Sequence, residues 1–191
     1  MNTSRRGFLG AGIASLAFIS TAEAKPATVP PIWEGQKMWE TFSQSSVGFT
    51  NPSSSETVRA YIAFDTQCPW CMVLHETLEP LYKDVRVKWC PIAWLGIHSE
   101  PQGALILSAS DPWALFLAHH KNFKNEGLKG LKYDKAALPV EAREAVWTNT
   151  KLHRRCGCRV VPFGVVKTSD GRYLALDAHM TKDELTELFK L

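Results

Sequence analysis

Residues 64–78 read FDTQCPWCMVLHETL, in which Cys68 and Cys71 are separated by a proline and a tryptophan. Before the pair, Val58–Phe64 is an apolar run of strand character, and the polar Asp65 ends it. After the pair, apolar residues recur at three- and four-residue spacing as far as Leu81, which predicts one buried face of a helix. The two cysteines therefore stand where a strand gives way to a helix.

This position suits a redox pair. Cys68 would lie at the N-terminus of the helix, where unpaired backbone N–H groups and the helix dipole stabilise a thiolate and lower its pKa to about 3.5–7.5. Cys71, one turn further along, would be more buried, keep a higher pKa and resolve the mixed disulfide that Cys68 forms with a substrate. Pro69 fits the first helical turn, and Trp70 adds an apolar surface beside the reactive sulfur.

Two other functions are compatible with the cysteine pair. A zinc or copper site needs further ligands, which Cys156 and Cys158 could supply, although a C-x-C pair is uncommon in structural zinc sites. A non-catalytic chaperone could use the apolar surface around Trp70. A purely structural disulfide between Cys68 and Cys71 is disfavoured, because so short a loop constrains the unfolded chain little.

The composition indicates one globular domain. The chain has 191 residues, of which 45% are hydrophobic, enough for one core and too few for two ordinary ones. The net charge of +3 comes from interspersed acidic and basic residues, so nothing indicates binding to nucleic acid.

Residues 1–24 read as a cleaved export signal. Arg5 and Arg6 precede an apolar run that is too short to span a membrane, and Ala22-Glu23-Ala24 follows as an A-x-A cleavage site. The paired arginines resemble the twin-arginine type of signal, which predicts a periplasmic protein. The five cysteines would then lie in an oxidising compartment, and an odd number leaves at least one without an intramolecular partner.

The rest of the chain alternates between strand and helix patterns. Residues 25–57 are a leader with one short docking helix, in which Trp33, Trp39 and Phe42 are docking residues. A thioredoxin-like domain with a helical insertion at about 97–139 would then occupy residues 58–191. Its expected elements after the cysteine pair are a strand at 85–95, helices near 103–108, 112–123 and 140–155, a hairpin of strands 163–168 and 172–176, and a last helix after the capping box Thr181–Glu184.

These motifs together resemble the catalytic domain of the periplasmic DsbC/DsbG disulfide isomerases over roughly residues 57–191. The resemblance is carried by FDTQCPWC, by VKWCPIAWL as the next strand, by ALILSASDPWALFLAHH as a helical insertion, and by VVPFGVV followed by TSDGRYL. It implies an α/β thioredoxin fold, with a central mixed sheet flanked by helices, and no cofactor beyond the protein's own cysteines. It also implies a cis Pro162 against the active-site sulfurs, and a Val161 whose backbone binds a substrate strand. The implied partners are unfolded or misoxidised proteins and a membrane thiol-redox protein.

The chain departs from that family in two respects. Residues 25–57 are too short to supply the dimerisation domain that precedes the catalytic domain in these isomerases, so the oligomeric state is open and a monomer is compatible with the sequence. The residue before the cis proline is usually Thr in the isomerases and Val in the DsbA-type oxidases, so Val161 leaves oxidase, reductase and isomerase activity as alternatives.

Cys90, Cys156 and Cys158 have no obvious counterpart in that family. Cys90 could be disulfide-bonded to Cys156 or Cys158, or all three could be buried thiols, or the C-G-C pair could relay oxidation to the active site. Asp65 could accept a proton from the resolving thiol or only end the strand. Three histidines are expected at the surface, His75 on the helix after the pair and His119 and His120 at a solvated helix end.

Overall fold

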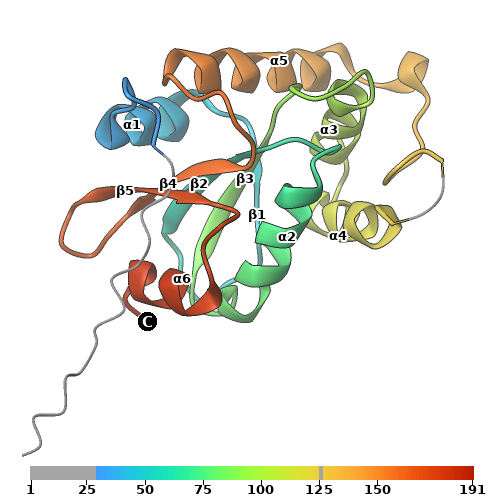
Figure 1. Cartoon of the computed structure of the whole chain (residues 1–191). Coiled ribbons are helices and arrows are strands. Elements are labelled where there is room, and N and C mark those ends of the chain that lie inside the picture. The colour runs from blue at the N-terminus through green and yellow to red at the C-terminus, as the bar shows by residue number, and fades with distance from the viewer. Residues whose placement is uncertain (1–28, 125–126) are drawn as a thin grey trace, which may run out of the picture.

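The computed structural model describes residues 29–124 and 127–191 (Figure 1). The predicted export signal lies outside the described residues. Five strands form one sheet in the order β1-β3-β2-β4-β5. Their bounds are β1 Phe49–Thr50, β2 Val58–Phe64, β3 Arg86–Pro91, β4 Phe163–Lys167 and β5 Tyr173–Asp177. The pair β2–β3 is parallel, and the other three pairs are antiparallel.

Helices cover both faces of this sheet (Figure 1). The α-helices are α1 Gly35–Ser45, α2 Pro69–Leu78, α3 Ser99–Leu107, α4 Pro112–Asn122, α5 Val140–Arg155 and α6 Lys182–Phe189, and two short 3-10 helices are η1 Glu79–Leu81 and η2 Lys135–Ala137. No helix among the described residues is long and apolar enough to cross a membrane.

The central strand β2 supplies both cores because its side chains alternate between the two faces. Ala60, Ile62 and Phe64 join the core beneath α2, α4 and α6, whereas Tyr61 and Ala63 join the core beneath α1 and α5. Burial on both faces explains why this strand reads as a continuous apolar run.

The predicted elements agree closely with the observed ones. The strand Val58–Phe64 and the helix Val140–Arg155 have their expected bounds, and the hairpin strands differ by one or two residues. Asp111 caps α4, with its side chain accepting a hydrogen bond from the Ala114 N–H, and Thr181 and Glu184 form the expected capping box. The strand expected at 85–95 is shorter, and α3 begins four residues earlier than expected.

The segment before β2 is more integrated than the sequence suggests. Trp39 packs edge-on against Tyr61, with ring centroids 4.8 Å apart, and Phe42 is fully buried, so α1 docks on the sheet as expected. Sequence analysis predicts no strand here, but Phe49 and Thr50 pair with β3 as the sheet's outer strand.

Candidate active site

Cys68 lies at the junction between β2 and α2. It is the N-cap residue of α2, with an extended backbone, and Pro69 is the first helical residue. The Cys68 N–H donates to the Asp65 carbonyl over 3.0 Å, which closes the turn that links strand to helix. The sulfur therefore stands beside the N–H groups of the first helical turn, as the sequence predicts.

The two sulfurs of the pair occupy contrasting environments. A hydrogen bond from the Cys71 thiol lowers the pKa of Cys68, and the backbone N–H groups of Cys71 and Trp70 act in the same direction, against burial and the charge of Asp65. Burial raises the pKa of Cys71 well above its usual value, since that side chain has no exposed surface. Cys68 is therefore the member of the pair that ionises first.

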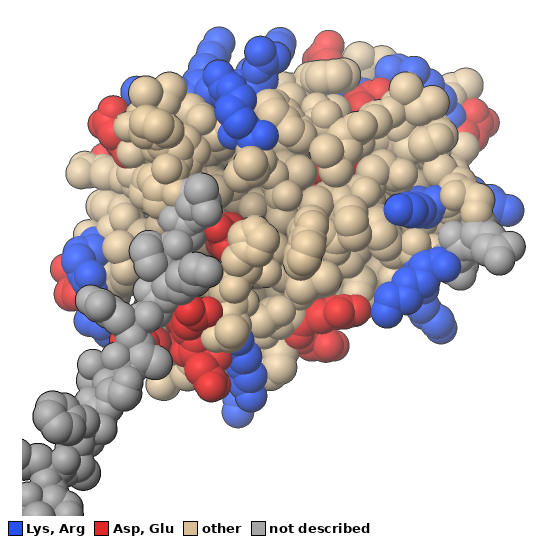
Figure 2. All heavy atoms as spheres, viewed as in Figure 1, with Lys and Arg blue, Asp and Glu red and all other residues tan. Residues whose placement is uncertain are grey.

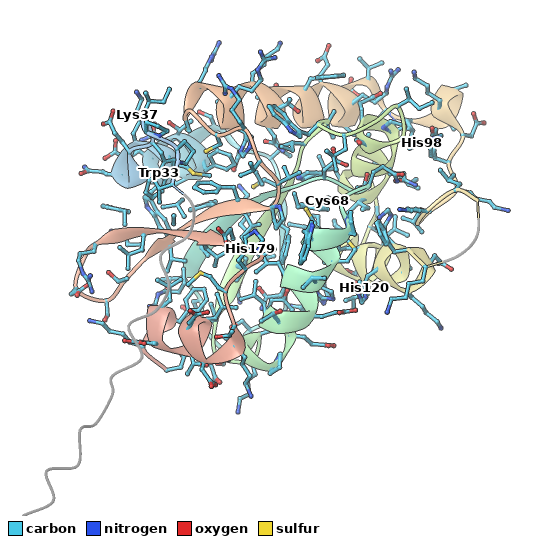
Figure 3. All side chains as sticks on the ribbon, viewed as in Figure 1. Trp33, Lys37, Cys68, His98, His120 and His179 are labelled. Atoms are coloured by element: carbon cyan, nitrogen blue, oxygen red, sulfur yellow. The ribbon has the colours of Figure 1, made fainter. Side chains whose placement is uncertain are left out.

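The loop before β4 brings Val161 and Pro162 to this sulfur. The Val161–Pro162 peptide bond is cis, as the resemblance implies. The Cys68 thiol donates to the Val161 carbonyl over 3.4 Å, although 93 residues separate the two. Trp70, with 53% of its surface exposed, lies on the adjacent turn of α2. Four candidate residues, Cys68, Trp70, Val161 and Pro162, thus meet at one place, and Figure 3 labels Cys68 there.

Asp65 is fully buried directly beneath this turn. Its carboxylate accepts three backbone N–H groups, from Gln67 at 2.7 Å, Trp94 at 2.7 Å and Leu95 at 2.8 Å. Its own N–H donates to the Cys71 sulfur over 3.4 Å. Asp65 therefore ties the cysteine turn to the loop after β3, and its negative charge disfavours both thiolates.

His119 is a residue of this site that sequence analysis placed wrongly at a solvated helix end. It is fully buried, and its Nε2 lies 2.8 Å from the Thr66 carbonyl, two residues before Cys68. Because a carbonyl only accepts, Nε2 carries the proton, and Nδ1 accepts the Leu131 N–H over 3.3 Å. The one sequence signal for a buried His119 is the glycine at position 130. Gly130 has a φ of +78°, and a Cβ there would come within 2.1 Å of the His119 imidazole.

His75 also differs from its expected position at the surface. Only 2% of its surface is exposed, and its Nδ1 lies 2.9 Å from the Tyr82 hydroxyl. Burial lowers the pKa of His75 to about 4, with a smaller effect of His120 in the same direction. His120 is the histidine nearest to its expected surface position, and it pairs with Glu76 at 3.0 Å.

The remaining three cysteines lie apart from the pair. Cys68 and Cys71 belong to the core on the α2 face of the sheet, whereas Cys90, Cys156 and Cys158 belong to the core on the α1 face. All five are free, buried thiols in this structure. Across residues 29–124 and 127–191, no three His, Cys, Asp or Glu side chains are grouped as a metal site needs, so the four thiols of the metal hypothesis do not converge.

Comparisons with known proteins rest on structure alone. No protein-family profile matches the sequence, and a search of curated proteins finds no significant match. A periplasmic thioredoxin-like protein from Salmonella enterica serovar Typhimurium is similar, with a TM-score of 0.62 and 19% identity over 80% of this chain and 94% of that one. So is the catalytic domain of Proteus mirabilis ScsC, with a TM-score of 0.59 and 20% identity over 82% of this chain and 96% of that one.

DsbG of Helicobacter pylori is a third structural neighbour, with a TM-score of 0.51 and 22% identity over 68% of this chain and 60% of that one. Identities this low show the fold alone, and it is the predicted α/β thioredoxin fold. The neighbours are a mixed group of thioredoxin-like proteins, so they do not single out the narrower DsbC/DsbG resemblance.

Proposed function

We propose that this chain is a periplasmic thiol–disulfide oxidoreductase that exchanges disulfides with protein substrates through Cys68 and Cys71. The observation that carries the proposal is the opposite shift of the two thiols: the pKa of Cys68 is lowered and that of Cys71 is raised, while the Val161 carbonyl lies against the Cys68 sulfur. The export signal and the periplasmic structural neighbour support the location.

In the proposed reaction the Cys68 thiolate attacks one sulfur of a substrate disulfide. The substrate S–S bond breaks, a mixed disulfide forms, and the leaving sulfur takes up a proton. Cys71 then gives up its proton and attacks the Cys68 sulfur, the S–S bond between Cys68 and the substrate breaks, and the second substrate sulfur leaves and takes up a proton in place of the one that Cys71 lost. The substrate disulfide is reduced to two thiols while the protein's two thiols become one disulfide, and the reverse sequence oxidises a substrate.

The other proposed site residues act around these sulfurs. Val161 offers backbone groups to an extended substrate strand, and Pro162 fixes the path of that backbone. Pro69 starts the helix that stabilises the thiolate, and Trp70 supplies apolar contact. Burial, with smaller effects of the Cys68 sulfur and of the Asp65 charge, keeps the pKa of Cys71 high and the thiol protonated until the mixed disulfide brings an electrophilic sulfur within reach.

Selective alkylation tests the division of labour. Cys68 should react with iodoacetamide at mildly acidic pH while Cys71 does not, and Cys68→Ser should abolish insulin reduction. Cys71→Ser should trap mixed disulfides with periplasmic proteins, because attack continues when resolution is lost. Equal alkylation of both cysteines at every pH, with no trapped species, would leave only a binding function.

The reduction potential of the pair decides the direction of exchange. Equilibration with glutathione should give a reduction potential of about −120 mV if the protein is a strong oxidant and of about −270 mV if it is a reductant. The double variant Cys68→Ser, Cys71→Ser is the control, since its remaining three buried thiols should show no equilibrium in the same range.

A further inference from the structure

A groove adjoins the candidate active site. Its volume is about 550 Å³, and Trp70, Val161 and Pro162 form the wall nearest to Cys68. Because the Cys68 sulfur contacts the Val161 carbonyl, a chain that reaches the sulfur along Val161 also enters this groove. His179 lines the groove with its ring 5.6 Å from that of Trp70, and both His179 and Cys68 are labelled in Figure 3.

The opposite wall comes from the protein's own N-terminal segment, Val29–Pro31. Two neighbouring residues anchor it. Ile32 lies against Gly157, whose φ is +81° and where a Cβ would come within 2.6 Å of the Ile32 side chain. Trp33 donates its N–H to the Pro30 carbonyl over 3.0 Å and packs edge-on against Phe163. The C-G-C sequence thus has a structural use: its glycine admits the segment that walls the groove.

The chemistry of the groove favours an apolar occupant. Val29 and Val160 are 42% and 50% exposed, and the prolines that line the groove with them carry no N–H to donate. Two charged residues also line the groove: one nitrogen of the exposed Arg159 guanidinium donates to the carbonyls of Arg154 and Cys158, and the Asp177 carboxylate accepts the His179 N–H over 2.9 Å. Figure 2 shows Lys and Arg mainly at the margins of this face and uncharged residues over most of its centre. The groove therefore offers mainly apolar contact, with Arg159 and Asp177 as its charged residues.

We propose that Val29–Pro31 and Val160 set substrate specificity by binding an apolar segment that flanks the substrate's reacting cysteine. This inference rests on the proposed thiol–disulfide exchange. The substrate class is then protein chains whose apolar residues next to a cysteine are exposed, as in unfolded proteins. A segment that enters the groove buries apolar surface against Val29, which stabilises the encounter without changing the reacting sulfurs.

Two disulfide peptides that differ only beside the cysteine test the proposal in the mature, full-length protein. One carries leucines next to its cysteine and the other carries serines. Val29→Glu should raise KM for the leucine peptide about fivefold or more, because it places a charge in the wall. The variant should leave kcat, the KM for the serine peptide and the pKa of Cys68 unchanged. Val29→Leu should restore the native KM.

The matched control is Val140→Glu, at a valine that is also exposed, 61% against 42% for Val29, and that lies at the start of α5 outside the groove. Val140→Glu should leave the KM for both peptides unchanged. Equal KM values for Val29→Glu and the native protein on the leucine peptide would overturn the inference. An equal rise in KM for both peptides would overturn it as well. Glutathione separates the two proposals: failure of the native protein to exchange disulfides with glutathione in either direction would contradict the proposed function, whereas exchange with glutathione together with an unchanged leucine-peptide KM in Val29→Glu would contradict only the inference.

Discussion

At the scale of single residues, local environment rather than residue type sets the chemistry of the five cysteines. Cys68 alone has a lowered pKa, because it receives hydrogen bonds from the Cys71 thiol and from the first helical turn. Burial raises the pKa of Cys90 to about 11 and that of Cys158 to about 12, so both stay protonated near neutral pH. Thiolates carry out disulfide exchange, and these two thiols are therefore poor participants.

The double change Cys156→Ser, Cys158→Ser should accordingly leave insulin reduction within about twofold of the native rate. Nucleophile, resolver and Pro162 are all retained, and the two serines lie in the core on the α1 face of the sheet. Stability should fall by roughly 1–3 kcal/mol, because each change buries a hydroxyl among apolar side chains. Insulin turnover and urea unfolding check both statements. A hundredfold loss of activity in a folded variant would instead make this pair a redox relay.

The sequence predicts the cysteine site well because its signals are local. The spacing of Cys68 and Cys71 and the turn from strand to helix all lie within fifteen residues. The histidines were misplaced for the opposite reason. His75 and His119 are buried by residues of other elements, Trp113 and Phe116 around His75 and Thr66 and Leu131 around His119. Helical spacing predicts a face but not which distant element covers it.

At the scale of elements, the helical segments between β3 and α5 hold the active-site turn in place. His119 on α4 binds the Thr66 carbonyl, and Gln67 donates to Gln102 on α3 over 2.5 Å. Gln102 in turn donates to the carbonyls of Lys129 and Leu131 at 2.8 Å each. Side chains from α3 and α4 therefore fix the turn that presents Cys68. Hydrogen bonds of this kind join single polar side chains that lie far apart in the sequence, and no periodic pattern in the sequence predicts them.

His119→Leu should raise the pKa of Cys68 by about half a unit or more and slow its alkylation at acidic pH. The change leaves the buried Thr66 carbonyl without its donor, so the turn shifts and the helix N–H groups align less well with the sulfur. His119→Gln keeps a donor and an acceptor and should restore part of the shift. Thiolate absorbance at 240 nm against pH measures both variants. A Cys68 pKa unchanged in His119→Leu would show that the contact serves stability alone.

At the scale of the whole molecule, buried polar side chains as well as apolar ones hold the elements against the sheet. Asn51, which follows β1, accepts the Val87 N–H over 2.7 Å and donates to the carbonyls of Tyr82 and Val85. A run rich in serine and proline surrounds it, so composition indicated a leader rather than the outer edge of a sheet. His153 is fully buried at the end of α5, with its Nε2 3.0 Å from the Val160 carbonyl.

These buried histidines should make the fold sensitive to acid. Burial lowers the pKa of His75 and of His153 to about 4 each, against about 6.5 in the unfolded chain. Between these values the unfolded chain binds more protons, so the free energy of unfolding falls as pH drops from about 6.5 to about 4 and is unaffected by them above that window. Each histidine accounts for a loss of about 3 kcal/mol once pH reaches the lower end.

His75→Phe isolates one of these contributions. Phenylalanine suits the aromatic surroundings of Trp113 and Phe116 but cannot bind a proton, and the lost contact to Tyr82 costs roughly 1 kcal/mol at every pH. Urea unfolding at pH 7 and pH 4.5 should therefore show a stability loss about 2 kcal/mol smaller in the variant than in the native protein. The exposed His179→Phe is the control and should keep the native pH dependence. If His75→Phe also keeps it, His75 is protonated equally easily in the folded and unfolded chains, and burial does not set its pKa.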